Sequence, residues 1–205
     1  MLFELVNEYY GKTIAGKNTL QLIGKSKFIS TMYRKCELLN VPTEFVRYPT
    51  KGHPAIVDHE VSDIQIPASQ DIDGAGEFSA AAEAVYRLID DVCETISGKS
   101  ICIIGRGKAV RGLREALEAR GATVVQCNSK TRNVLSLSAV CDIVILAAPI
   151  NVRNVAIVNK RLIVDLAGKL SCPAANCGTV NFYSAGEIGR LTTAILAYRA
   201  SIWEG

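Results

Sequence analysis

The apolar residues of this chain change their spacing near residue 98. Before that point the pattern alternates between short segments, with helices predicted over 2–10 and 28–39 and strands over 19–23 and 43–48. Three breakers then interrupt the pattern, namely Pro49, Gly52 and Pro54. An extended segment is expected over 63–66 and a loop over 67–77, followed by a helix over 79–97 that Gly98 is placed to end.

The remainder of the chain is more regular. Residues 100–104 form an apolar run of the kind found in parallel strands buried on both faces. A glycine-containing turn, a helix ending near residue 120 and further strands follow, at 123–127, 142–147 and 161–166, with a last helix over 185–201. This alternation predicts an α/β protein: a small α/β N-terminal domain (1–97), then a Rossmann-type doubly wound parallel sheet (98–205) whose C-terminal helix returns to the first domain.

Composition narrows the class of protein. The 205 residues are 49% hydrophobic and 21% charged, which is enough apolar material for a buried core. A net charge of +3 gives no reason to expect nucleic acid as a partner. The longest apolar run, 143–150, is far shorter than the roughly 20 residues that span a bilayer. The first ten residues do not resemble a signal peptide, so we expect a cytoplasmic protein with no membrane partner.

The seven cysteines do not suggest a metal site. Five lie within apolar or helical patterns, where a free thiol behaves as a small hydrophobic group. Cys172 and Cys177 share a loop, but their spacing is wide for a metal-binding pair and no second pair accompanies them. We therefore expect free thiols and no metal.

The turn after the strand at 100–104 has features of a dinucleotide site. Gly105 and Gly107 are placed to form a tight bend and to let the backbone approach a pyrophosphate. The third glycine of the usual fingerprint would fall at Val110, whereas Gly112 comes two residues later. An ordinary strand-to-helix turn is the alternative, and the βαβ pattern that follows favours the nucleotide.

The loop after the second strand of this sheet favours NADP over NAD. An NAD site places a carboxylate there to bind the ribose 2′-hydroxyl. Here the loop offers Ser129, Lys130 and Arg132 instead, and Arg106 lies in the glycine turn. Cations and hydroxyls are suited to a 2′-phosphate. The alternative is a solvated basic surface.

Six segments together resemble the methylenetetrahydrofolate dehydrogenase/cyclohydrolase family. They occur in the family's order and cover nearly all of residues 99–200, at 105–110, 127–131, 141–145, 163–165, 178–182 and 186–192. The resemblance implies an NADP-binding Rossmann domain in which Arg106 and Ser129 contact the 2′-phosphate. The cofactor-binding residues expected from the turn and the loop are Gly105, Arg106, Gly107, Ser129, Lys130 and Thr131.

The resemblance is thinner in the front half, which is shorter than in the family. It places Gln65 and Asp73 in a folate cleft as the residues nearest the chemistry, with Phe28 and Thr192 binding the substrate. The family's catalytic lysine aligns with Met32, whose thioether cannot transfer a proton. Lys25, Lys27 or Lys35 could replace that lysine. The family's glycine and proline near the last helix are also replaced, by Glu187 and Arg190.

Three functions are consistent with these residues. The first is an NADP-dependent methylenetetrahydrofolate dehydrogenase-like oxidoreductase that has lost the cyclohydrolase step and acts on a folate-like small molecule. The second is an NADP-dependent oxidoreductase acting on another small substrate. The third is a non-catalytic nucleotide-binding protein of the same fold. The resemblance also implies a possible homodimer.

Overall fold

The chain divides into two units. The structure is a computed structural model that describes residues 2–13, 18–58, 61, 63–74, 78–150, 160–170 and 180–204. The C-terminal unit comprises residues 81–189, and the N-terminal unit comprises residues 2–80 together with 190–205. The sequence pattern placed the boundary at 97/98, whereas in the structure the helix before that point groups with the C-terminal sheet.

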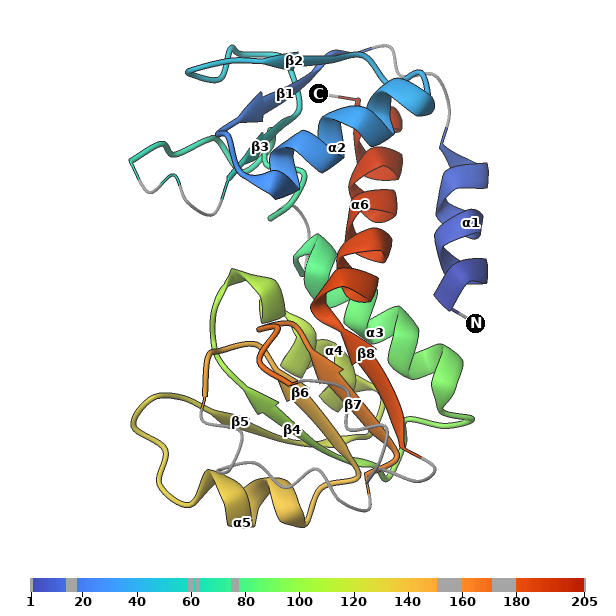
Figure 1. Cartoon of the computed structure of the whole chain (residues 1–205), viewed down its shortest axis with the longest axis vertical. Helices are drawn as coiled ribbons and strands as arrows, with labels where there is room; N and C mark the ends of the chain where they lie inside the picture. Colours follow the sequence, from blue (N-terminus) through green and yellow to red (C-terminus); the bar gives the residue numbers. More distant parts are fainter. Residues whose placement is uncertain are drawn as a thin grey trace. The chain divides into compact units, whose positions relative to one another are not determined.

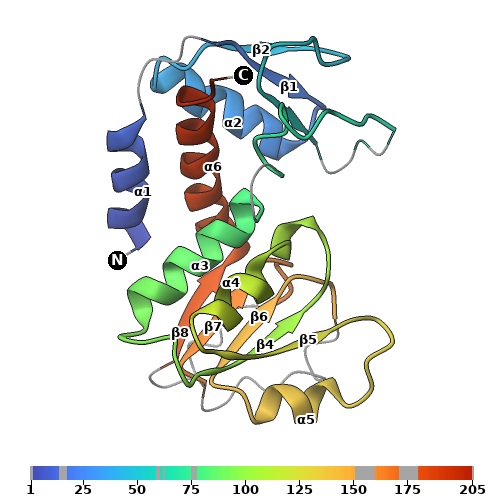
Figure 2. The same cartoon turned by 180° about the vertical axis from the view of Figure 1, so that it is seen from behind.

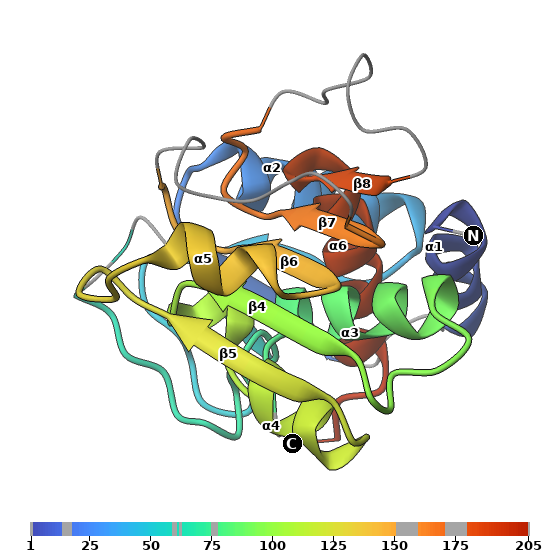
Figure 3. The ribbon, with the colours of Figure 1, turned by 90° about the horizontal axis from the view of Figure 1, so that it is seen from below.

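The C-terminal unit is built on a parallel sheet with the strand order β5-β4-β6-β7-β8. Its strands are β4 (Ser100–Ile104), β5 (Thr123–Cys127), β6 (Ile143–Leu146), β7 (Leu162–Asp165) and β8 (Asn181–Ser184). β6 and β7 are buried at every position, as expected for strands covered on both faces. Helices α3 (Ala80–Val92) and α4 (Leu113–Ala119) lie on one face and α5 (Val134–Ala139) on the other (Figures 1 and 3). The predicted α/β class is confirmed.

The N-terminal unit contains a second, smaller parallel sheet. Its strand order is β2-β1-β3, with β1 (Leu20–Ile23) between β2 (Thr43–Phe45) and β3 (Ala55–Val57) (Figure 1; Figure 2 shows β1 and β2 from behind). Helix α2 (Lys27–Leu38) begins at the N-cap Ser26 and buries Ile29, Met32 and Cys36, which share one helical face.

Two further helices complete the N-terminal unit: α1 (Leu2–Lys12) and the C-terminal part of α6 (Ala185–Ser201). The rings of Tyr9 and Tyr198 meet edge to face with centroids 5.8 Å apart. The Arg199 guanidinium donates hydrogen bonds to the carbonyl oxygens of Ile72 (2.9 Å) and Phe78 (3.2 Å). These contacts tie the end of the chain to its N-terminal third. None of the helices in the described ranges is both long and apolar enough to cross a bilayer.

Several elements differ from the sequence-based expectation. Strand β8 (Asn181–Ser184) was not predicted, and β2 ends at Phe45 although the predicted strand extends to residue 48. The third strand of the small sheet is Ala55–Val57, directly after Pro54, whereas the predicted extended segment 63–66 is a loop. Pro54 is tolerated because it directly precedes the strand, where its carbonyl oxygen accepts the Gln21 N–H (2.9 Å) and Ala55 supplies the next N–H, which donates to the Gln70 carbonyl oxygen (2.7 Å). Helix α3 ends at Val92, five residues before Ser97, where the Thr95 hydroxyl accepts the Ser97 N–H (3.2 Å) in a local turn that competes with the helix.

Candidate dinucleotide site

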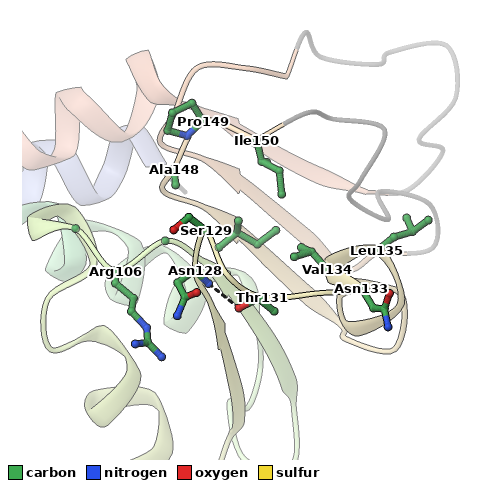
Figure 4. A pocket seen from close by; sticks show the side chains of 13 residues that line it. Arg106, Asn128, Ser129, Thr131, Asn133, Val134, Leu135, Ala148, Pro149 and Ile150 are labelled. Carbon is green, nitrogen blue, oxygen red and sulfur yellow. Dashed lines mark hydrogen bonds between the residues drawn. The ribbon is translucent and has the colours of Figure 1, made fainter.

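A cavity of about 860 Å³ lies at the carboxyl ends of three neighbouring strands of the C-terminal unit. Its walls follow β4 (104–107), β5 (128–135) and β6 (148–150), as Figure 4 shows. β5 lies on one side of β4 and β6 on the other, so the chain reverses its winding at β4. In open α/β sheets, ligands bind at the carboxyl edge where the winding reverses.

The glycines in and after the turn that follows β4 are needed for different structural reasons. Gly105 has φ +130°, and a Cβ there would lie 3.0 Å from the backbone carbon of Ala147, so packing against the end of β6 requires glycine. Gly112 has φ +77° and forms the N-cap of α4, after a short 3₁₀ turn η1 (Lys108–Val110). The positive φ at this N-cap explains why the third glycine is Gly112, two residues after the usual fingerprint position.

Gly107 is the exception, because neither its backbone nor its packing needs glycine. Its φ of −70° and ψ of 177° are open to any residue, and a Cβ there would meet no atom within 4 Å. Gly107 lines the cavity. The missing side chain therefore leaves room on the cavity side, which is the role of a glycine that lets a ligand approach the backbone.

The loop after β5 is held by its own side chains. Thr131 Oγ1 accepts the Asn128 N–H (2.9 Å), and Asn128 Oδ1 accepts the Lys130 N–H (2.8 Å). Asn128, Ser129 and Thr131 line the cavity; Lys130 is exposed and does not. Of the six predicted cofactor-binding residues, the structure therefore places Gly105, Arg106, Gly107, Ser129 and Thr131 around one cavity.

Arg106 is the only charged side chain among the described residues that line this cavity. In Figure 4, Asn128 and Ser129 lie between Arg106 and the apolar pair Val134 and Leu135, with Ala148–Ile150 forming the opposite wall. A cavity with a guanidinium and no described carboxylate is suited to an anion.

Sequence reasoning missed Gln126, a polar residue within the otherwise apolar strand β5. Its side-chain amide donates a hydrogen bond to the Gly105 carbonyl oxygen (2.9 Å), while the Gly105 N–H donates to the Cys127 carbonyl oxygen (2.9 Å). The glycine turn is thus fixed to β5 through both of its peptide groups. The signal was available, because a half-buried glutamine near the carboxyl end of a strand that adjoins the glycine turn needs a polar partner.

The folate residues implied by the resemblance lie in the N-terminal unit. Met32 has no solvent exposure and packs in the core, while Phe28 on the same helix is half-buried. Gln65 is exposed in a loop, Asp73 is half-buried in a turn and Thr192 on α6 is 7% exposed.

A second cavity, of about 940 Å³, lies within the N-terminal unit and none of those five residues lines it. Among the lysines that could replace the family's lysine, Lys25 lines this cavity, whereas Lys27 is exposed and does not line it. Lys35 instead places its ammonium 5.5 Å from the ring centroid of Tyr10.

The replacement of the family's glycine by Glu187 has a local structural reason. Glu187 Oε2 accepts hydrogen bonds from the Ser184 N–H (2.9 Å) and hydroxyl (2.7 Å), and the Glu187 N–H donates to Ser184 Oγ (3.4 Å). This reciprocal pair is a capping box at the start of α6. Arg190, at the family's proline position, is exposed.

The cysteines that the structure describes are free and buried: Cys36, Cys93, Cys102, Cys127 and Cys141. Burial raises the pKa of Cys36 to about 12 and also raises the pKa of Cys102, so neither is a ready nucleophile. In the described ranges no group of three or more histidine, cysteine or acidic side chains could hold a metal ion. Cys172 and Cys177 lie outside the described residues.

Comparison with known proteins places these features in a family. Residues 79–197 match the model of the tetrahydrofolate dehydrogenase/cyclohydrolase NAD(P)-binding domain. The chain is 29% identical over 173 residues to a bifunctional protein FolD 1 from Salinispora arenicola, an alignment that covers 77% of this chain and 56% of that protein. The chain thus spans little more than half the length of this relative.

Two solved structures share the fold. A 5,10-methylenetetrahydrofolate dehydrogenase from the silkworm Bombyx mori superposes with a TM-score of 0.74 and 18% identity, covering 97% of this chain and 93% of that one. A Trypanosoma brucei methylenetetrahydrofolate dehydrogenase-cyclohydrolase, solved with NADP and an inhibitor, superposes with a TM-score of 0.71 and 14% identity. The superposition covers 97% of this chain and 93% of that one.

Proposed function

Since this chain belongs to the tetrahydrofolate dehydrogenase/cyclohydrolase family by its NAD(P)-binding domain, we propose that it is an NADP-dependent oxidoreductase. We propose further that it resembles methylenetetrahydrofolate dehydrogenase and lacks the cyclohydrolase step. The observation that carries the proposal is the cavity at the carboxyl edge of the large sheet. Arg106 and Ser129 line it together, and no carboxylate is among the described lining residues.

The residues present fit NADP. Gly107 leaves open the space that a Cβ would fill, although the backbone does not need glycine there. Gly105 and Gly107 would hold the pyrophosphate, and Arg106 with Ser129 and Thr131 would hold the 2′-phosphate, where a charge-assisted hydrogen bond contributes about 1.5–3 kcal/mol. The Trypanosoma relative solved with NADP supports this choice of cofactor.

Oxidation of the substrate places few demands on the protein. When bound, NADP⁺ supplies the hydride acceptor. The methylene carbon loses a hydride and becomes the methenyl cation, so no side chain has to remove a proton. The chain's contribution is to hold and orient the two ring systems and to exclude water.

Hydrolysis of the methenyl product, unlike the oxidation, needs a side chain placed to transfer a proton. Such general acid–base catalysis raises a rate by about 10²–10⁴-fold. Met32, which aligns with the family's lysine, has no solvent exposure and carries no titratable group. Its burial supports the proposed loss of the cyclohydrolase step.

An oxidoreductase acting on another small substrate is the second candidate. The observation that favours it is that Phe28, Gln65, Asp73 and Thr192 do not line the cavity of the N-terminal unit. A different set of side chains faces that cavity, so a different substrate is chemically reasonable.

One experiment separates these functions. The purified chain is supplied with methylenetetrahydrofolate and NADP⁺ or NAD⁺, and reduced cofactor is measured by its absorbance; hydrolysis of methenyltetrahydrofolate is followed separately. We expect NADPH formation, a slower reaction with NAD⁺, and hydrolysis no faster than in buffer. Tight NADP binding without reduction of the cofactor would favour another substrate or a non-catalytic protein, and rapid hydrolysis would overturn the proposed loss.

The proposal includes a cytoplasmic location and a homodimer, both of which rest on the family resemblance. Light scattering coupled to gel filtration measures the mass in solution, and fractionation of the source cells tests the location. A mass of one chain, 22.1 kDa, at assay concentrations would contradict the dimer.

A further inference from the structure

The large sheet has a second half at its ligand-binding edge. On the other side of β4 from β5 the strands run in the order β6, β7 and β8, and Figure 3 shows β4, β6 and β7 side by side. A doubly wound sheet takes one mononucleotide on each side of its winding reversal. Because Arg106 and Ser129 are assigned to the 2′-phosphate on the side of β4 and β5, the nicotinamide end of the cofactor belongs over the ends of β6 and β7.

A buried aspartate ends a strand on that side. Asp165 is the last residue of β7, it is 1% exposed, and the three residues before it are buried and apolar. The strand has a neighbour on both sides, so Asp165 lies between Leu146 on β6 and Ser184 on β8. A carboxylate inside a sheet is costly unless its oxygens are hydrogen-bonded. The partners of its two oxygens therefore indicate what the carboxylate does.

One oxygen has a structural role. Asp165 Oδ2 accepts the N–H of Leu170 (2.6 Å), which closes the segment 166–170 back onto the end of the strand. The N–H groups of Leu166 and Ala167 both donate to the Leu146 carbonyl oxygen, over 2.8 and 3.1 Å. The segment after β7 is thus fixed to the ends of two neighbouring strands.

The other oxygen has no such role. Asp165 Oδ1 is buried and has no hydrogen-bond partner among the residues that the structure describes. Arg161 and Lys169, the cations nearest to it in sequence, are both exposed. An asparagine would supply the same acceptor to Leu170 without a buried charge, so holding the segment does not require an acid. Buried polar atoms without a partner are rare in packed cores and are expected at functional sites.

The oxidised and reduced forms of the cofactor differ in charge at the nicotinamide ring. The ring is a cation in NADP⁺ and neutral in NADPH, and a charge close to the ring tunes this difference. A fixed negative charge attracts only the cationic ring, and the attraction is stronger beside buried strand ends than in water. The electrostatics of the protein can therefore select between two ligands of nearly the same shape.

We propose that Asp165 is a specificity-determining residue that makes the chain prefer oxidised over reduced cofactor. Its buried carboxylate stabilises the cationic nicotinamide ring of NADP⁺, and its hydrogen bond with Leu170 keeps the carboxylate in place. Binding of the oxidant and release of the reduced product are then both favoured. The inference rests on the proposed function, because the dinucleotide cavity has to hold NADP for Asp165 to act on the ring.

The test measures the dissociation constants of NADP⁺ and NADPH for the full chain by calorimetry. The wild-type chain should bind NADP⁺ more tightly than NADPH. Asp165→Asn keeps an acceptor for Leu170 and removes the charge, so the ratio of NADP⁺ affinity to NADPH affinity should fall about tenfold. The ratio for NAD⁺ and NADH should fall by the same factor, because the effect acts on the ring and not on the 2′-phosphate.

Asp142→Asn is the matched control. Asp142 Oδ2 also accepts a backbone N–H, that of Ser100 (2.9 Å), but Asp142 directly precedes β6 and so lies at the opposite edge of the same sheet. The same change of charge there should leave the ratio unchanged.

Asp165→Ser removes the charge with a smaller side chain and should lower the ratio by the same factor as Asp165→Asn. Melting temperatures identify any variant that does not fold. The preference of the wild-type chain for NADP⁺ tests the proposal without a variant.

The outcomes separate the two proposals. If the variants lose affinity for NADP⁺ and NADPH by the same factor, Asp165 only holds the segment 166–170 and the inference is overturned. An unchanged ratio, or tighter binding of NADPH by the wild-type chain, overturns it as well. None of these results affects the proposed function, which the formation of NADPH from methylenetetrahydrofolate tests. If the wild-type chain binds neither NADP⁺ nor NADPH, the proposed function fails and this inference fails with it.

Discussion

Gln126 and Gly105 form the contact that fixes the phosphate-binding turn: the glutamine side-chain amide donates to the glycine carbonyl oxygen over 2.9 Å. Gly105 also donates its N–H to Cys127 (2.9 Å), so neighbouring residues of β5 hold both peptide groups of the turn. Gln126 is thus a positioning residue that acts through the turn.

Gln126→Met keeps the size of the side chain and removes its donor. Because one hydrogen bond contributes about 0.5–1.5 kcal/mol, cofactor affinity should fall about three- to tenfold. NADP and NAD should lose the same factor, since both carry the pyrophosphate that the turn would face. Titration of the two cofactors checks this, with the melting temperature recorded for each protein. A loss confined to NADP would contradict the positioning role.

Gly107→Ala should change stability and binding in opposite directions. The backbone at Gly107 accepts alanine and no atom lies within 4 Å of the new Cβ, so the unliganded protein should gain about 0.4–1 kcal/mol. The methyl group enters the cavity, and NADP affinity should fall. Chemical denaturation and cofactor titration measure the two effects. Unchanged affinity in a stabilised variant would show that no ligand approaches this glycine.

Arg106→Ala should remove the preference for NADP over NAD. Loss of a charge-assisted contact worth about 1.5–3 kcal/mol lowers NADP affinity roughly tenfold or more and leaves NAD affinity unchanged. Arg111→Ala is the matched control, because Arg111 is an exposed arginine just after η1 that does not line the cavity. Equal NADP affinity in both variants would leave the 2′-phosphate without an arginine partner.

Met32→Lys should destabilise the N-terminal unit and should not create a catalytic lysine. Met32 has no solvent exposure, and an unpaired ammonium in a core costs on the order of several kcal/mol. Thr31→Lys, at the exposed neighbouring position of α2, should change stability by about 0.5 kcal/mol or less. Urea denaturation compares them. A Met32→Lys protein that is fully stable and hydrolyses methenyltetrahydrofolate would show that this side chain reaches the substrate.

Asp142 should make stability depend on pH. Its Oδ2 accepts the Ser100 N–H (2.9 Å) and hydroxyl (2.8 Å), and these bonds, the backbone one first, lower the pKa of the carboxyl below its ordinary value. A carboxyl with a lowered pKa in the folded state stabilises the protein above its unfolded pKa, and this stability is lost as the pH falls through the folded value.

The stability difference between wild type and Asp142→Asn should therefore be constant at neutral pH and shrink below about pH 4. Denaturation at a series of pH values measures it. In a Ser100→Ala background the contact from Ser100 Oγ is absent, so the stability difference that Asp142→Asn causes at neutral pH should be smaller. A difference that grows on acidification would contradict the assignment.

Four of the five strands of the large sheet could be predicted from the sequence, because they need no help from distant residues to be recognised; β8 (Asn181–Ser184) was not predicted. Strands 100–104 and 123–127 have the predicted bounds, since short segments rich in apolar β-branched residues and flanked by glycines or polar loops favour one element only. The predicted last helix, 185–201, has the same bounds in the structure, where Ser184 and Glu187 cap it. Local chemistry decided these elements.

Other features depended on residues far apart in the chain. Ala55–Val57 is too short to stand out beside Pro54, and it is a strand because β1 offers it a parallel partner. Met32 aligned with a catalytic position, yet the face of α2 that packs on the core includes it. The placement of Asp58 beside Ser26, and of Gln126 beside Gly105, likewise follows from strand order.

The sequence by itself thus determined the periodic elements and the chemical character of the dinucleotide loop, because both are set by residues close together in the chain. Only the tertiary structure decided which side chains share a cavity, because that depends on which strands become neighbours and on which face of each helix is buried.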